Sequence, residues 1–107
     1  MNELMEMYKT ILERKANPEE GSYTSYLFDK GLEKILKKVG EECTEVIIAS
    51  MKGDADEIAG EMNDLIYHLL VLLAEKDIPL SKIEEVMAAR NEKTHNLKAE
   101  RKPVTNL

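Results

Sequence analysis

The amino-acid sequence predicts an all-α protein, a helical bundle built around two long central helices. Apolar residues recur every three to four positions over most of the 107 residues, which is the spacing of one face of an α-helix. No segment shows the apolar–polar alternation of a half-buried β-strand. Helix-stopping residues at Asn17-Pro18, Gly53 and Pro79 divide the chain into its helical segments.

The N-terminal third is expected to contain one amphipathic helix and a connection. Residues 1–16 carry an apolar face that consists of Leu4, Met7, Tyr8, Ile11 and Leu12. Residues 19–24 are expected to form a loop, and residues 25–30 a short segment that leads into the first long helix. That helix should run from about Gly31 to Lys52, with Cys43 in the centre of its apolar stripe as a buried, inert thiol.

The second long helix is predicted at about residues 57–76, and apolar residues nearly encircle its axis. They are Ile58, Met62, Leu65, Ile66, Leu69, Leu70, Val71, Leu72 and Leu73. A helix that is apolar all round needs neighbours on all sides, so we expect a homodimer in which a second subunit completes the bundle. Gly40 and Gly60 lie mid-helix and cost about 1 kcal/mol each; they are either tolerated imperfections or points of close helix approach.

The chain is expected to end in one more helix and a tail. Ser81 to Glu84 has the pattern of a capping box after the turn at Pro79. We divide the chain into a helical domain, residues 1–90, and a polar C-terminal tail, residues 91–107.

Composition excludes several classes of protein. The net charge of −6 argues against a nucleic-acid-binding role, because phosphate backbones are bound by basic patches. The longest apolar run, residues 69–74, is too short to span a membrane. The single cysteine excludes an internal disulfide and suits a reducing compartment, and no signal peptide is visible. A cytoplasmic enzyme or binding module is expected.

Two pairs of acids are the strongest candidates for a functional site. Residues three apart share a helix face, and each pair borders the apolar stripe of its own helix. When the two stripes pack together, both pairs should flank one groove. The acids are Glu42, Glu45, Glu61 and Asp64.

Converging carboxylates repel one another, and a hard divalent cation such as Mg²⁺ removes that conflict. One ion or a pair could be held. Lys34 and Lys38 lie on the same stripe and could meet phosphate oxygens. A single Glu-x-x-Glu pair is usually a solvated helix face, so the spacing leaves open both metal-assisted phosphate chemistry and a merely acidic surface. His68 also lies on the acidic stripe, where a hydrogen-bonded structural histidine is favoured over a ligand.

The spacing of these acids and the runs around them resemble those of a known family. Glu42-x-x-Glu45, followed after fifteen residues by Glu61-x-x-Asp64, resembles the signature of the MazG-like all-α nucleotide pyrophosphohydrolases. Three further features resemble the phosphoribosyl-ATP pyrophosphatases within that superfamily, over about residues 1–90. They are the runs Ser22–Phe28, Lys34–Glu42 with the preceding Gly31, and Asp64–Leu73.

The resemblance implies a reaction, a cofactor and an assembly. The reaction is hydrolysis of the α–β phosphoanhydride of phosphoribosyl-ATP to phosphoribosyl-AMP and pyrophosphate, the second step of histidine biosynthesis. Mg²⁺ dependence, the four acids as metal ligands and a homodimer are also implied. We expect the stand-alone form, without the cyclohydrolase that follows this domain in fused relatives. The position of Ser22, Tyr23 and Thr24 in the family implies contact with the substrate.

The expected mechanism assigns a role to each remaining residue. Mg²⁺ would bridge the triphosphate and lower the pKa of a bound water that attacks in line. Lys38 and Lys34 would stabilise charge on the phosphoryl oxygens, and Glu41 is a candidate general base. Two alternatives stay open. They are a house-cleaning pyrophosphatase for non-standard nucleoside triphosphates, against which the first two runs speak, and a non-catalytic helical dimerisation module.

Overall fold

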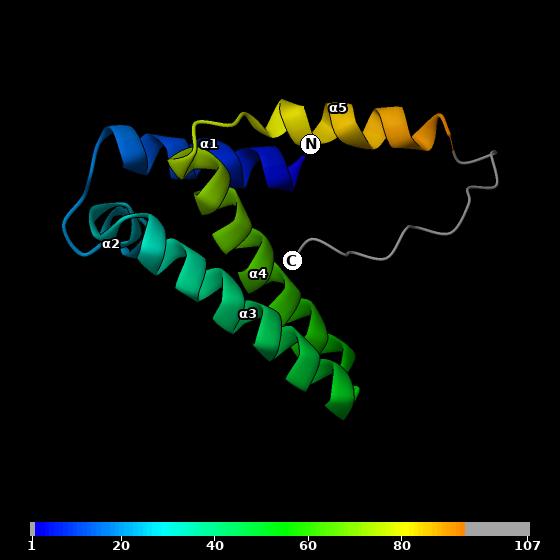
Figure 1. Ribbon diagram of the computed structural model, residues 1–107. Helices are drawn as coiled ribbons and strands as arrows, with labels where there is room; N and C mark the ends of the chain where they lie inside the picture. Colours follow the sequence, from blue (N-terminus) through cyan, green and yellow to red (C-terminus); the bar gives the residue numbers. More distant parts are fainter. Residues whose placement is uncertain (1, 94–107) are drawn as a thin grey trace, which may run out of the picture.

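The computed structural model describes residues 2–93 and, within that range, contains five α-helices and no β-strand (Figure 1). The helices are α1 (Glu3–Ala16), α2 (Tyr23–Lys30), α3 (Leu32–Lys52), α4 (Ala55–Glu75) and α5 (Leu80–Asn91). The all-α prediction is confirmed. Most of the predicted tail, including residues 94–107, lies outside the described residues.

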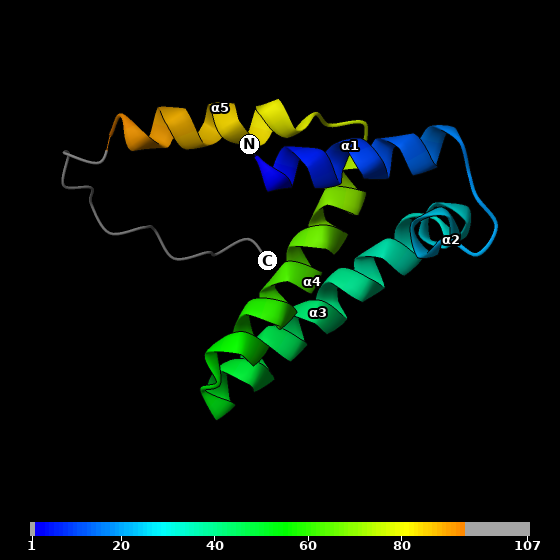
Figure 2. The ribbon, with the colours of Figure 1, turned by 180° about the vertical axis from the view of Figure 1, so that it is seen from behind.

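An antiparallel hairpin of α3 and α4 dominates the molecule. Gly53 ends α3 in the left-handed conformation (φ +83°), which glycine adopts without steric cost. Asp54 is the N-cap of α4, and its carbonyl accepts from the N–H of Ile58 at 2.9 Å. The turn is therefore tight, and the two long helices run side by side away from α1 and α5 (Figures 1 and 2).

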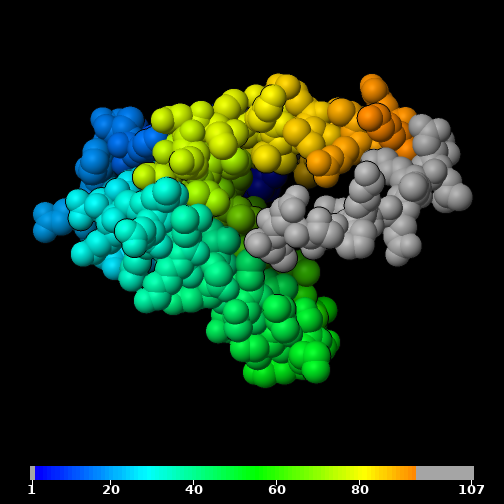
Figure 3. Space-filling model, viewed as in Figure 1, coloured from blue at the N-terminus to red at the C-terminus, as the bar shows by residue number. Residues whose placement is uncertain are grey.

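The hydrophobic core lies where α1 and α2 meet the opposite end of this hairpin. Its buried members are Tyr8, Ile11, Leu27, Ile35, Leu70, Val71, Ala74 and Leu80. The far end of the hairpin projects beyond this core (Figure 3). There Ile47 is 64% exposed and Met51 is 85% exposed.

The prediction of a buried Cys43 is wrong, because its side chain is exposed. In the single subunit, α4 covers only one side of the apolar stripe of α3 on which Cys43 lies. The helical wheel identified an apolar face but not which neighbour covers it.

Three contacts attach α1 to the turn between α4 and α5. The Tyr8 hydroxyl donates to the carbonyl of Ile78 at 2.6 Å. The Lys15 ammonium donates to the carbonyl of Ala74 at 2.6 Å and pairs with Asp77 at 2.9 Å. The bonds to the carbonyls of Ile78 and Ala74 are part-buried, so the loss of either donor would leave a carbonyl with reduced access to water. The N-terminal helix thus closes onto the C-terminal end of α4.

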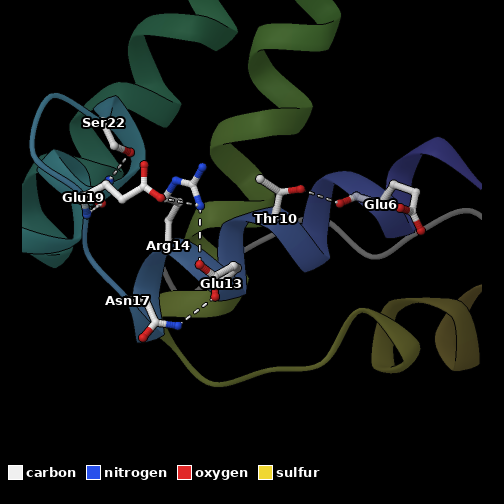
Figure 4. Close-up of polar contacts among 8 residues, drawn as sticks. Glu6, Thr10, Glu13, Arg14, Asn17, Glu19 and Ser22 are labelled. Carbon is white, nitrogen blue, oxygen red and sulfur yellow. Dashed lines mark hydrogen bonds and ion pairs between the residues drawn. The ribbon is translucent and has the colours of Figure 1, made fainter.

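The connection from α1 to α2 is ordered by polar contacts (Figure 4). The Arg14 guanidinium lies between the carboxylates of Glu13 and Glu19, at 3.5 and 3.3 Å. The backbone N–H of Glu19 donates to Ser25 Oγ, and the backbone N–H of Ser25 donates to Ser22 Oγ at 3.1 Å. Ser22 is therefore the N-cap of α2.

Two predicted boundaries are wrong. Residues 19–24 are not all loop, because the cap at Ser22 lets Tyr23 and Thr24 form the first turn of α2. The capping box at Ser81 is wrong as well. Pro79 is the N-cap of α5, its ψ of 149° keeps it extended, and Ser81 lies inside the helix.

Gly40 and Gly60 lie in open surroundings. Among the described residues, a Cβ built at either position meets no atom within 4 Å. Within one subunit this favours tolerated imperfection over close helix approach. In the same part of the chain, no helix is both long and apolar enough to cross a membrane.

Candidate metal and phosphate site

Carboxylates from both long helices converge on one side of the hairpin. One carboxylate oxygen from each of Glu42, Glu61 and Asp64 lies within 4.8 Å of the other two. The spacing of three residues turns each pair towards the same face of its helix, and the hairpin brings the two faces together. Glu45 lines the same groove but lies outside this closest set.

The groove has a volume of about 370 Å³ and is lined by Lys38, Glu41, Glu42, Glu45, Glu61 and Asp64. The four predicted metal ligands thus line one depression, together with the predicted catalytic pair. An oxygen-only donor set fits a hard cation such as Mg²⁺. The chemistry of the lining residues therefore fits the ion that the sequence predicted.

Repulsion among these acids shows in the pKa of Glu61. Burial raises the pKa of this carboxyl first, and the carboxylates of Glu45, Asp64, Glu42 and Glu57 raise it further. A divalent cation removes such repulsion, because it offsets the excess of carboxylates over lysines in the groove. The electrostatics of the groove thus favour cation binding.

A lysine of α3 faces these acids. The Lys38 ammonium lies 3.1 Å from Glu41 Oε1 and 3.9 Å from Glu42 Oε1. The hydrogen bond with Glu41 raises the pKa of Lys38 and, reciprocally, lowers the pKa of Glu41. Lys38 is therefore held as a cation, whereas Glu41 is a weaker base than an ordinary glutamate.

Lys34, the second predicted phosphate contact, points elsewhere. Its ammonium lies 6.0 Å from the ring centroid of Tyr26, and that of Lys30 lies 5.8 Å from the same ring. Both are at cation–π distance. The structure thus brings Lys38, but not Lys34, to the lining of the groove.

The three predicted substrate contacts in residues 22–24 have their hydroxyls engaged. Ser22 Oγ caps α2, Thr24 Oγ1 is hydrogen-bonded to the Tyr67 hydroxyl, and the Tyr23 hydroxyl lies 2.8 Å from His68 Nε2. Tyr23 remains 44% exposed. The structure places these residues beside α4, and their contact with the substrate stays a prediction.

The prediction that His68 is a hydrogen-bonded structural histidine is confirmed. It is 5% exposed, and its Nδ1 lies 2.7 Å from the carbonyl oxygen of Asp64. The sequence reasoning missed its partner Tyr23 and the neighbouring pair of Thr24 with Tyr67. The spacing of four residues between Asp64 and His68 is visible in the sequence, but the contacts with α2 depend on tertiary packing.

Comparisons with known proteins agree with this geometry. The sequence model of the family described as phosphoribosyl-ATP pyrophosphohydrolase matches residues 4–91. A protein of Clostridium acetobutylicum named phosphoribosyl-ATP pyrophosphatase is 55% identical over 97% of this chain and 94% of its own length. Proteins of the same name from Listeria innocua and Streptococcus thermophilus are each 54% identical. They cover 97% and 94% of this chain, and 99% and 95% of their own lengths.

Proposed function

This chain belongs to the phosphoribosyl-ATP pyrophosphohydrolase family, and from that premise we propose that its acidic groove is the active site. The reaction is hydrolysis of phosphoribosyl-ATP to phosphoribosyl-AMP and pyrophosphate, a step of histidine biosynthesis. Relatives at 54–55% identity over nearly the whole chain carry the name of this activity. The house-cleaning alternative has no comparable support.

The observation that carries the site is the convergence of three carboxylates beside one cation. Glu42, Glu61 and Asp64 offer oxygens within 4.8 Å of one another, with Glu45 in the same groove. We propose that these four acids hold Mg²⁺. When bound there, Mg²⁺ would neutralise charge on the phosphate oxygens and activate the attacking water.

The chain itself supplies the remaining groups. Lys38 would donate to phosphoryl oxygens as their charge develops, because its raised pKa keeps it protonated at neutral pH. Glu41 is the proposed proton acceptor. Its contact with Lys38 counts against that role, because a lowered pKa weakens a base. An E41Q variant tests it directly.

Substrate contacts are proposed along α2 and the start of α3. Of Ser22, Tyr23 and Thr24, Tyr23 is the best placed, because Lys38 and Glu42 both affect the pKa of its phenol. Lys34 lies one helical turn before Lys38 and would meet a part of the substrate that extends past the groove towards Tyr26.

A homodimer is proposed from the apolar surface of the single subunit. Met62, Ile66 and Leu69 on α4 are 40–47% exposed. Part of that surface opens into an apolar cleft of about 390 Å³ between α4, α5 and the start of α1. A second subunit would cover this surface and gain about 25 cal/mol of free energy for each Å² of apolar area removed from water.

We also propose a cytoplasmic location and a helical domain that ends near residue 90.

The test of this function is a phosphoribosyl-ATP assay with and without Mg²⁺, beside a panel of non-standard deoxynucleoside triphosphates. We expect phosphoribosyl-ATP to be the only one of these substrates that releases pyrophosphate. This release should require Mg²⁺. Faster hydrolysis of the other triphosphates would support the house-cleaning alternative. If calorimetry detects no saturable Mg²⁺ binding and no turnover occurs, the chain is a dimerisation module and the proposal is wrong.

A further inference from the structure

The imidazole of His68 lies between α2 and the acidic groove, with both nitrogens engaged. Nδ1 lies 2.7 Å from the carbonyl oxygen of Asp64 and Nε2 lies 2.8 Å from the hydroxyl of Tyr23. A carbonyl oxygen only accepts hydrogen bonds, so Nδ1 carries the proton of the neutral ring. Nε2 is then an acceptor, and the Tyr23 hydroxyl donates to it.

Packing leaves this ring little freedom to turn. The ring of Tyr23 meets it at 75° with centroids 5.6 Å apart, and the ring of Tyr67 meets it at 87° with centroids 4.9 Å apart. Edge-to-face contacts of this kind are favourable. Together with the two hydrogen bonds and 5% exposure, they fix the direction in which Nε2 points.

The direction of Nε2 in turn decides how the Tyr23 hydroxyl is oriented. Its hydroxyl hydrogen is committed to His68, so the phenol oxygen presents lone pairs to its other neighbours. Burial raises the pKa of this phenol, the Lys38 ammonium opposes that rise, and Glu42 adds to it. Lys38 and Glu42 thus both act electrostatically on this phenol, whose oxygen keeps lone pairs that can accept a further hydrogen bond.

We infer that His68 is a positioning residue of the proposed active site, which fixes the orientation of the Tyr23 hydroxyl relative to α4. The same imidazole is bonded to the backbone of Asp64, whose carboxylate belongs to the converging set. His68 therefore connects α2 to the part of α4 that carries Asp64. This inference rests on the proposed function, since Tyr23 and Asp64 belong to the proposed site.

The experiment compares variants of the full chain with a matched control. Y23F and H68L each break the bond between Tyr23 and His68, and H68Q keeps an acceptor that the Tyr23 hydroxyl can reach. Y67F is the control, because it removes the neighbouring bond between α2 and α4, to Thr24. Steady-state kinetics with phosphoribosyl-ATP and Mg²⁺ then separate kcat from KM.

We expect Y23F and H68L to lower kcat roughly fivefold to tenfold, the equivalent of one lost hydrogen bond. An interaction that acts in the transition state has this signature. The double variant should be no worse than the worse single variant, H68Q should keep most of the wild-type kcat, and Y67F should keep nearly all of it. A kcat within twofold of wild type in both Y23F and H68L, or an equal loss in Y67F, would overturn the inference.

Two measurements do not depend on turnover. Nitrogen-15 NMR should show the Nδ1-protonated tautomer of His68, with a shifted Nε2 resonance in Y23F; the Nε2-protonated tautomer would overturn the inference. The affinity for Mg²⁺, measured by calorimetry, should be the same in Y23F and wild type. Should H68L fail to fold, the comparison of Y23F with Y67F decides alone. A wild-type chain that does not hydrolyse phosphoribosyl-ATP would instead refute the proposed function, and the NMR result would still test the geometry.

Discussion

Asp64 offers the sharpest test of the metal site, because D64N removes one of three converging carboxylates while keeping the shape of the side chain. The backbone carbonyl of Asp64, which His68 binds, is unchanged. A ligand that binds only the folded state stabilises it by RT ln(1 + [L]/Kd). At a Mg²⁺ concentration one hundred times Kd, this gives about 2.7 kcal/mol.

For a domain of this size, each kcal/mol moves the melting temperature by about 4–8 °C, so Mg²⁺ should raise the Tm of the wild type by roughly 10–20 °C. If D64N weakens binding a hundredfold, the same concentration contributes only about 0.4 kcal/mol. The expected rise is then roughly 2–3 °C. Turnover should be lost together with this Tm shift.

The assay is thermal unfolding with and without Mg²⁺, and E57Q is the matched control. Glu57 lies on the same helix and raises the pKa of Glu61, but it lies outside the closest set of carboxylates. E57Q should therefore keep the Tm shift of the wild type. An unchanged shift in D64N, or the same loss in E57Q, would refute this assignment of the site.

Three further predictions follow from the contacts described above. Glu61 has a raised pKa in the folded state, so without metal its contribution to stability is present at low pH and is lost as the pH rises through that pKa. The affinity for Mg²⁺ should increase over the same pH range. Tm measured against pH for wild type and E61Q checks both statements, and identical pH profiles of the two proteins would contradict them. L69E should dissociate the proposed homodimer, because Leu69 is 40% exposed on the apolar face of α4; sedimentation velocity measures this, and a wild type that is monomeric at micromolar concentration counts against the dimer. Y8F should cost about 1–2 kcal/mol in denaturant unfolding, since it leaves the part-buried carbonyl of Ile78 without its donor, and its kcat should stay near that of wild type because Tyr8 does not line the groove.

The long helices and the groove could be predicted because both depend on local periodicity. The interval of three residues between Glu42 and Glu45, and again between Glu61 and Asp64, sets a helix face before any tertiary contact forms. Gly53 marks the turn that folds one face against the other. The place of the acids therefore follows from the sequence alone.

The errors have two physical origins, one local and one long-range. Ser22 begins α2 through a bond with the backbone of Ser25, a short-range signal that the sequence contains and that the loop prediction for residues 19–24 leaves out. The exposure of Cys43 depends on which neighbour covers its helix face, and the bond between Tyr23 and His68 spans 45 residues. Periodicity carries no information about partners that distant.

The attachment of α1 to the α4–α5 turn also bears on how the chain reaches this structure during synthesis. The partners Tyr8 and Ile78 are 70 residues apart, and at about 5–20 residues per second the ribosome needs roughly 4–14 s to make the chain between them. Until then α1 lacks these bonds to the end of α4 and the turn after it, whereas α3 and α4 can pair as soon as both are made. The first helix to be synthesised is thus expected to complete its contacts only after the hairpin has been made.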